Sequence, residues 1–224
     1  MKARINIAFK NKNGQIITRT YGHDRIIKFN ASKEDRCNHD SIQYGLSSQY
    51  GDIELLEKDA EFRILNENAQ LQDGLDISIE VCKQENSYIP IGCYKSQNWR
   101  ISDNELSVQV NLIDALESLR GVRLNKYNLN ELNALMQLNQ KSLTAELLLQ
   151  ALLKIGGLAH ELVYRDTVSR LHIQRIWTAD LFLARGTVFD MIKRLLQSLK
   201  MRMYIGARQV NGRIEPSVIV YKAD

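Results

Sequence analysis

The chain has 224 residues, of which 44% are hydrophobic and 25% are charged, an ordinary composition for a globular protein. No apolar run approaches the roughly 20 residues that a membrane helix needs, and the N-terminus lacks the apolar core of a secretory signal peptide. Cys37, Cys82 and Cys93 are an odd and widely spaced set, which argues against a disulfide framework and favours a reducing compartment.

The formal net charge of +4 is unevenly distributed along the chain. Residues 1–50 hold 9 Lys/Arg and 4 Asp/Glu, residues 51–120 hold 6 and 14, and residues 121–224 hold 15 and 8. The resulting blocks of +5, −8 and +7 suit docking between neighbouring subunits, and the acidic block is a candidate docking surface. A polyanion guided along the basic segments, or charges that only solvate the surface, would give the same pattern.

The first part of the chain predicts short strands separated by turns. Apolar and polar residues alternate over residues 5–9, as in a half-buried strand, and an Asn-Gly pair at 13–14 predicts a hairpin turn. Residues 21–40 are polar and predict a loop or an irregular edge. Residues 60–67 predict a short helix. Further strands are expected at 53–55, 75–81, 89–95 and 106–112.

After Asp114 the apolar period changes from that of a strand to that of a helix. A short helix is predicted up to Gly121, and a second one runs from an N-cap at Ser142 to Ile155. Residues 161–177 predict extended chain. A capping box opened by Thr187 predicts a helix through 200, and an Asn-Gly pair at 211–212 predicts a second hairpin.

These elements predict an α+β fold. Residues 1–112 are expected to form a β-rich, barrel-like or sandwich domain, and residues 113–200 a helical segment with an extended stretch. Residues 201–224 are expected to form a β hairpin. A hairpin alone is marginally stable, so this one must add to a sheet in the first domain, pair with another chain or begin a second β domain, and we favour the third interpretation.

No pattern identifies a catalytic, cofactor-binding or metal-binding residue. Residues 37–40 bring a thiol, an imidazole and a carboxylate together, but zinc sites commonly need a second ligand pair, and none follows. The nucleophile elbow, the HExxH zinc motif and the phosphate-binding loop are missing from the sequence. His23, His160 and His172 are isolated, and the five carboxylates within 52–61 suit a solvated or partner-facing surface better than an acid/base pair. We therefore expect a protein that is not an enzyme and needs no cofactor.

The aromatic residues are too scattered to form a base-stacking platform, so they are expected to pack in the core or in interfaces. Trp99 is the clearest case. If its ring is buried in the β core, replacement by alanine would cost about 3–5 kcal/mol.

Residues 48–119 carry a family resemblance. The matching features are Ser48 to Tyr50 followed by Gly51-Asp52-Ile53-Glu54-Leu55, Asp73-Gly74 before a strand, Ile91-Gly92-Cys93-Tyr94, Asn98-Trp99, and Asn104–Leu112 running into Asp114-Ala115-Leu116. Their order resembles the N-terminal part of the baseplate hub, or tail-associated protein, of bacteriophages and phage-tail-like particles. A weaker match follows, where Asp180-Leu181 precedes Gly186 to Phe189. The chain departs from the family pattern in two ways. The residues after Trp99 do not show the Tyr-Asp pair that family members commonly have, and the chain is shorter than most hubs.

The resemblance implies a structural protein of the virion tail that is synthesised in the host cytoplasm. Such hubs form a homo-oligomeric ring, commonly a trimer, that connects the tail tube to the tip and surrounds the channel. The implied partners are the tail tube, other baseplate proteins and the tape-measure protein. No membrane contact is implied, and DNA is met only in transit.

Three alternatives remain open at this point. A distal tail or tube-adaptor protein, usually hexameric, also begins with a β domain. Tail-tip peptidases and cell-wall hydrolases carry their activity on C-terminal extensions, of which this sequence shows no sign. A nucleic-acid-binding module is suggested only by the basic segment 121–224, and it would bind with a steep salt dependence.

Overall fold

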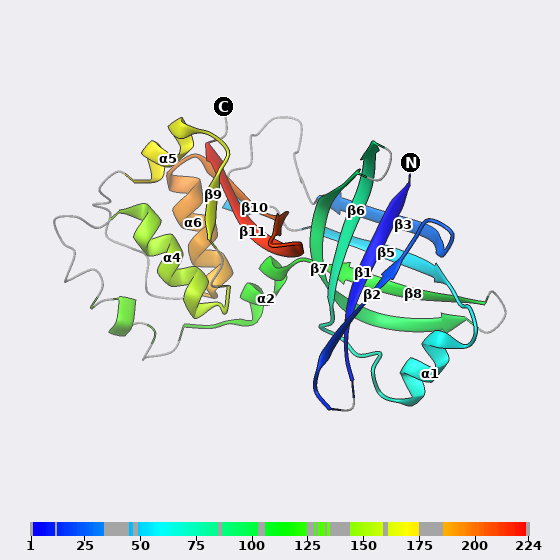
Figure 1. Cartoon of the computed structure of the whole chain (residues 1–224). Helices are drawn as coiled ribbons and strands as arrows, with labels where there is room; N and C mark the ends of the chain where they lie inside the picture. Colours follow the sequence, from blue (N-terminus) through cyan, green and yellow to red (C-terminus); the bar gives the residue numbers. More distant parts are fainter. Residues whose placement is uncertain are drawn as a thin grey trace. The chain divides into compact units, whose positions relative to one another are not determined.

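The computed structural model describes residues 2–11, 13–33, 45–46, 49–84, 87–102, 106–124, 128, 130–132, 134, 144–158, 161–174 and 186–222. The chain divides into two compact units (Figure 1). The first unit comprises residues 1–34, 49–114 and 206–216, and the second comprises 35–48, 115–205 and 217–224. Strands and helices occur in separate runs, so the α+β prediction is confirmed. None of the described helices is long and apolar enough to cross a membrane.

One seven-stranded antiparallel sheet dominates the first unit, in the order β2-β1-β6-β7-β8-β5-β3. Its strands are β1 (Ala3–Lys10), β2 (Ile16–Tyr21), β3 (Ile26–Lys33), β5 (Gln49–Leu56), β6 (Asp76–Gln84), β7 (Ser87–Ser102) and β8 (Ser107–Ile113). The long strand β7 pairs with β6 along its first part and with β8 along its second, and register shifts mark both ladders. Such irregularities bend strands, and the sheet is strongly curved (Figure 1). Within the described residues no ladder joins β2 to β3, so the sheet is barrel-like but open.

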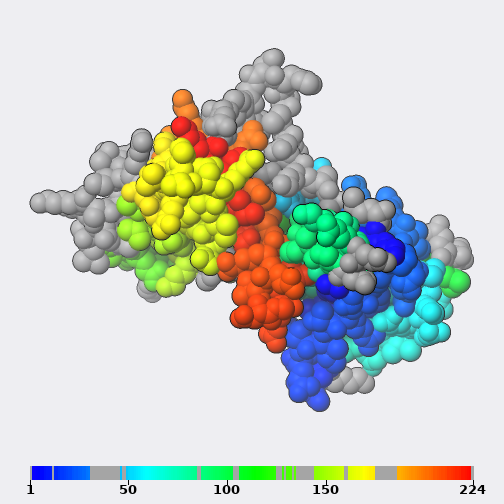
Figure 2. All heavy atoms as spheres, turned by 45° about the horizontal axis from the view of Figure 1, so that its top comes forward, coloured from blue at the N-terminus to red at the C-terminus, as the bar shows by residue number. Residues whose placement is uncertain are grey.

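The concave side of this sheet holds the core of the first unit. Alternate residues of β1 are fully buried, as the sequence pattern predicts for Ile5, Ile7 and Phe9. Helix α1 (Glu61–Glu67) adds Phe62 and Leu65 to the same core, which confirms the predicted short helix. The β1–β2 hairpin protrudes at the margin of the unit, drawn in blue in Figure 2.

The polar region predicted as a loop or an irregular edge contains an edge strand. Strand β3 pairs only with β5 among the described strands, and its register shifts between Ile26 and Lys28. The second of the two alternatives is therefore correct for residues 26–33. Residues 34–40 lie outside the described part of the chain.

The second unit packs helices against a four-stranded mixed sheet of order β4-β10-β11-β9. The elements of these layers are β4 (Gly45–Leu46), α2 (Ala115–Gly121), α4 (Ala145–Ile155), β9 (Leu162–Tyr164), α5 (Thr167–Ile173), α6 (Val188–Ser198), β10 (Met201–Val210) and β11 (Arg213–Lys222). The tip of the β10–β11 hairpin, residues 206–216, is assigned to the first unit. Asn211 and Gly212 both have positive φ, 48° and 78°, as the predicted hairpin turn requires. The hairpin forms the middle of this sheet, because β4 pairs in parallel with β10 and β9 pairs in parallel with β11.

The helix boundaries follow their capping residues. Thr187 and Asp190 form the predicted capping box of α6. Thr144 is the N-cap of α4, and the predicted cap Ser142 lies outside the described residues. Of the extended chain predicted for 161–177, strand is found at Leu162–Tyr164, whereas Thr167–Ile173 form helix α5 instead, and residues 175–177 lie outside the described part of the chain.

The error at 161–177 has a local cause. The side chain of Asp166 accepts the backbone N–H of Ser169 at 2.7 Å and starts helix α5. Because one cap satisfies a free N–H of the first turn, it outweighs the short apolar alternation at 171–173. Ile173 is then buried against the other helices of the second unit.

Trp99 packs against the first core, as expected, but its ring is only half-buried, so the condition of full burial is not met. Its ring packs at the margin of the first core, and its indole Nε1 donates to the carbonyl of Gln72 at 3.0 Å. The preceding residue, Asn98, has a φ of 57° within the irregular part of β7, which turns the chain outward at this point.

We expect Trp99→Ala to lower the free energy of unfolding by about 1.5–3 kcal/mol, below the cost of removing a fully buried ring. The loss combines part of the apolar contact with one hydrogen bond. Urea unfolding followed by circular dichroism measures it. A loss near 5 kcal/mol would contradict the half-buried position.

Candidate functional site

Most of the acidic block is engaged inside the units. Of its fourteen carboxylates, eight bind a cation or a backbone N–H of the same unit. Four of them form one ion pair each: Asp52 with Lys28, Asp76 with Lys95, Glu80 with Arg4, and Glu117 with Arg120. A fifth, in Glu61, pairs with two arginines. Three others accept a backbone N–H: Glu57 from Phe62, Asp73 from Asn98, and Asp114 from Gln49. These contacts use part of the charge of the block within the fold, and the docking surface stays a prediction.

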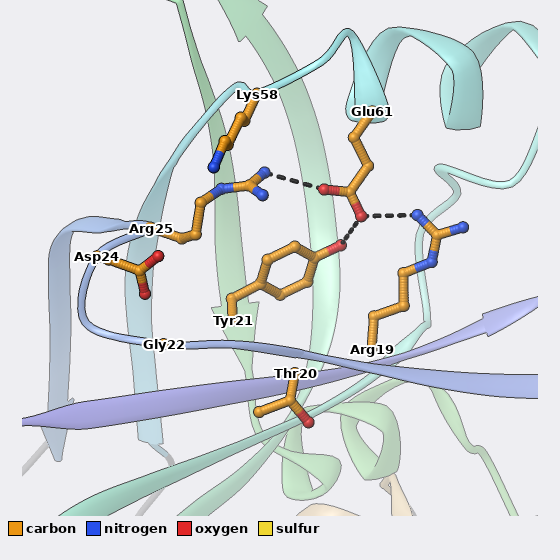
Figure 3. Close-up of a pocket in the computed structure, with 8 residues that line it drawn as sticks. All are labelled: Arg19, Thr20, Tyr21, Gly22, Asp24, Arg25, Lys58 and Glu61. Atoms are coloured by element: carbon orange, nitrogen blue, oxygen red, sulfur yellow. Dashed lines mark hydrogen bonds and ion pairs between the residues drawn. The ribbon is translucent and has the colours of Figure 1, made fainter.

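One hollow of about 450 Å³ opens on the first unit, where β2 ends and α1 begins (Figure 3). It is lined by Arg19, Thr20, Tyr21, Gly22, Asp24, Arg25, Lys58 and Glu61. The lining residues come from three places in the fold: the end of β2, the turn toward β3, and the segment that leads into α1.

The carboxylate of Glu61 lies at the centre of this hollow. Its Oε1 accepts Arg19 Nη1 at 2.6 Å and the hydroxyl of Tyr21 at 3.0 Å, while Oε2 accepts Arg25 Nη2 at 2.9 Å (Figure 3). Arg25 is itself fixed, since its Nε donates to the carbonyl of Leu56 at 3.1 Å. The Tyr21 ring stacks on Phe62 with ring centroids 5.3 Å apart. The cluster therefore joins the polar rim of the hollow to the apolar core.

These contacts set the protonation states. Burial disfavours the charged form of Glu61, but the hydrogen bonds from Arg19, Arg25 and Tyr21 outweigh it and hold the pKa of this carboxyl below its ordinary value. Burial, with the neighbouring Glu61 charge, raises the pKa of the Tyr21 phenol far above its ordinary value. At neutral pH the carboxylate is ionised and the phenol keeps its proton.

This arrangement suits a structural clamp better than a reaction. Both oxygens of Glu61 are occupied by donors, and a phenol with a strongly raised pKa is a poor base and a poor nucleophile. What the cluster does is tie the first turn of α1 to the end of β2. Among the residues that the structure describes, no group of three or more His, Cys, Asp and Glu side chains is placed to hold a metal ion.

We expect Glu61→Gln to lower the stability of the first unit by about 1–3 kcal/mol at pH 7, because charge-assisted hydrogen bonds are replaced by weaker ones. A carboxyl with a lowered pKa stabilises the fold above its unfolded pKa and loses that effect as the pH falls through the folded value. The difference between the wild type and the variant should therefore shrink below about pH 4. Urea unfolding at a series of pH values measures this, and a difference independent of pH would contradict the ionised clamp.

A second polar cluster crosses four neighbouring strands, β2, β1, β6 and β7, on the other face of the sheet. Arg4 donates to both oxygens of Glu80, at 2.5 and 2.8 Å, and its guanidinium lies 4.2 Å from the ring centre of Tyr88. Asn6 donates to Glu80 Oε2 at 2.9 Å and accepts the hydroxyl of Thr20 at 2.7 Å. Arg4 faces Glu80 in the β1–β6 register. The sequence marks these positions as polar, but only the register shows that they meet.

Those catalytic candidates that the structure describes are not brought together. Residues 37–40 and His160 lie outside the described part of the chain. His23 is exposed, and His172 Nε2 lies 2.9 Å from the carbonyl oxygen of Leu199. Cys82 and Cys93 are free thiols on β6 and β7, and burial raises the pKa of Cys93 to about 12, which keeps it protonated and unreactive.

Three segments of the family resemblance meet at one buried point. The side chain of Asp114 accepts the N–H of Gln49 at 2.6 Å, and the N–H of Asp114 donates to the carbonyl of Gln49 at 3.0 Å. The hydroxyl of Tyr94 donates to the Gln49 side chain at 3.2 Å. All three side chains are buried. Sequence reasoning quoted these positions as motif residues, but it missed that they form one junction, because they are up to 65 positions apart.

No protein-family model and no curated protein matches the chain. Among solved structures, it is similar to the 43 kDa tail protein of prophage MuSo2 from Shewanella oneidensis, with 10% identity, a TM-score of 0.47, and coverage of 98% of this chain and 56% of the other. It is also similar to the tail protein from Neisseria meningitidis MC58, with 11% identity, a TM-score of 0.49, and coverage of 96% and 51%. The chain thus spans about half the length of each. At TM-scores below 0.5, these likenesses establish neither a family nor a function for this chain.

Proposed function

We propose that the chain is a structural subunit of a phage or phage-tail-like tail tip. In this proposal it is a baseplate hub protein whose copies form a ring, commonly of three, around the tail channel and connect the tail tube to the tip. The observation that carries the proposal is the junction of Gln49, Tyr94 and Asp114. It joins the start, the middle and the end of the segment that resembles hub proteins.

The junction gives those motif residues a physical reason. Asp114 ends β8 and immediately precedes α2, while Gln49 begins β5. Their reciprocal hydrogen bonds fix the point where the chain leaves the sheet as a helix, and Tyr94 holds the Gln49 amide from β7. Polar groups that are buried need such partners, so these residue types at these positions specify the strand-to-helix exit.

Electron microscopy of assembled tail particles tests the proposal. We expect density for this chain at the tail tip, repeated three times around the tail axis. Six copies next to the tube would assign the chain to the tube-adaptor class instead. Particles without the chain, or with the chain away from the tail axis, would overturn the proposal.

A further inference from the structure

Strand β2 is an exposed and unprotected edge of the seven-stranded sheet. It pairs with β1 on one side, and no other described strand pairs with it. Residues 16–20 are all exposed, with Ile16 at 66% and Ile17 at 46%. An edge strand offers unpaired N–H and C=O groups, and natural proteins usually guard such edges with lysine, proline or bulges. The sequence of β2, IITRTY, holds no lysine and no proline, and its register with β1 is continuous. Its one charged side chain, Arg19, is bound to Glu61.

The opposite edge of the same sheet is guarded. Strand β3 contains Lys28 and Lys33, and its pairing with β5 shifts between Ile26 and Lys28. These are two of the devices that prevent edge-to-edge association. The contrast within one sheet indicates that β2 is an edge kept available for pairing.

The alternation of hydrogen-bonded pairs between β1 and β2 shows which backbone N–H and C=O groups of β2 point away from β1. Asn11 N–H donates to the Gln15 carbonyl at the end of the hairpin, so this pair is hydrogen-bonded. Hydrogen-bonded pairs alternate along an antiparallel ladder, which assigns Ile17, Arg19 and Tyr21 to the bonds with β1. The N–H and C=O groups of Ile16, Thr18 and Thr20 therefore face the open edge.

We propose that β2 pairs in antiparallel fashion with β2 of a second copy of this chain, about a two-fold axis at Thr18. This register uses all three outward-facing residues, with Thr18 opposite Thr18 and Ile16 opposite Thr20. Arg19 lies opposite Ile17, so no two like charges face each other. A two-fold contact requires one surface to complement itself, and this edge does so.

The pairing is separate from the ring contact of the proposed function. A two-fold contact joins two copies and stops there, whereas a ring repeats a contact between two different surfaces. The inference therefore does not rest on the tail-tip assignment. Its test uses the purified full chain, and its failure would leave the location of the chain in tail particles unaffected.

Sedimentation velocity of the wild type and of Thr18→Pro tests the pairing. Proline removes the outward N–H at the centre of the contact but leaves the bonds with β1, as edge strands tolerate. A contact this small predicts a weak monomer–dimer equilibrium, with a dissociation constant in the micromolar range or above. We expect Thr18→Pro to raise the dissociation constant at least about tenfold. The matched control Thr18→Val keeps the N–H and should associate like the wild type. A wild type that stays monomeric, or an association that Thr18→Pro leaves unchanged, would overturn the proposal.

A second pair of variants keeps the test decisive if Thr18→Pro does not fold. Thr18→Lys places two positive charges opposite each other at the two-fold axis and should also abolish the dimer. Ile27→Lys adds the same charge to the guarded edge β3, where Ile27 is 52% exposed, and should leave the dimer unchanged. Equal effects of the two substitutions would show that net charge, and not β2 pairing, controls the association, which contradicts the proposal.

Discussion

Replacing Phe62 with alanine is expected to lower the free energy of unfolding of the first unit by about 3–5 kcal/mol. The ring is fully buried and is the main anchor of α1 in the core of the curved sheet. It also carries the stacked ring of Tyr21, so its loss leaves a cavity beneath the Glu61 clamp. The effect should therefore exceed that of Glu61→Gln, which removes only polar contacts.

The control lies on the same helix. Ile64 is two positions further along α1 and is 51% exposed, so Ile64→Ala should change the stability by less than about 0.5 kcal/mol. Urea unfolding of the two variants, followed by circular dichroism, gives the comparison. Similar losses for both would show that α1 is not anchored through Phe62.

Leu149→Ala is expected to destabilise the second unit by about 2–5 kcal/mol. Leu149 is fully buried on the side of α4 that packs with α6 and with the inward-facing residues of β10 and β11. Truncation leaves a cavity between these layers, which a close-packed interior fills only in part. Hydrogen exchange should then accelerate in α4, α6 and β10, whereas β1 and β6 of the first unit keep their protection.

Leu147 provides the matched position for this prediction. It lies in the same helix, is 37% exposed, and its N–H is already bound by the Thr144 cap. Leu147→Ala removes the same atoms but less buried surface and leaves no enclosed cavity, so we expect a smaller loss, of about 1–1.5 kcal/mol. Faster exchange in the first unit of the Leu149 variant would contradict the assignment of Leu149 to the second core alone.

Features encoded by neighbouring residues could be predicted from the sequence. The Asn-Gly turn at 211–212, the Thr187 capping box and the apolar stripe of α4 depend on contacts within a few positions. Where two local signals compete, prediction failed, since the cap at Asp166 determines α5 despite an alternating apolar pattern. An irregular stretch of β7 at Asn98 leaves Trp99 only half-buried at the margin of the core.

The polar clusters could not be predicted, because they depend on strand register. Glu61 meets Arg19 and Arg25 across 42 and 36 positions, and Asp114 meets Gln49 across 65. A count of carboxylates gives the charge of a segment but not which of them are already paired. The charge of the acidic block therefore suggested a docking surface. The edge strand β2 has little charge, so the sequence gives no comparable signal for it.

The interleaved order of the second sheet has a consequence for how the chain folds on the ribosome. The seven strands of the first sheet are complete once Ile113 has been made. The second sheet cannot form until residues 213–222 have been made, because β11 lies between β10 and β9. Strand β4 (residues 45–46) is made early but has no partner until β10 follows. At about 5–20 residues per second this delay lasts roughly 5–20 s. Until then the apolar faces of α2, α4 and α6, once each helix has been made, lack the sheet that covers them, so the second unit exposes apolar surface for longer during synthesis than the first.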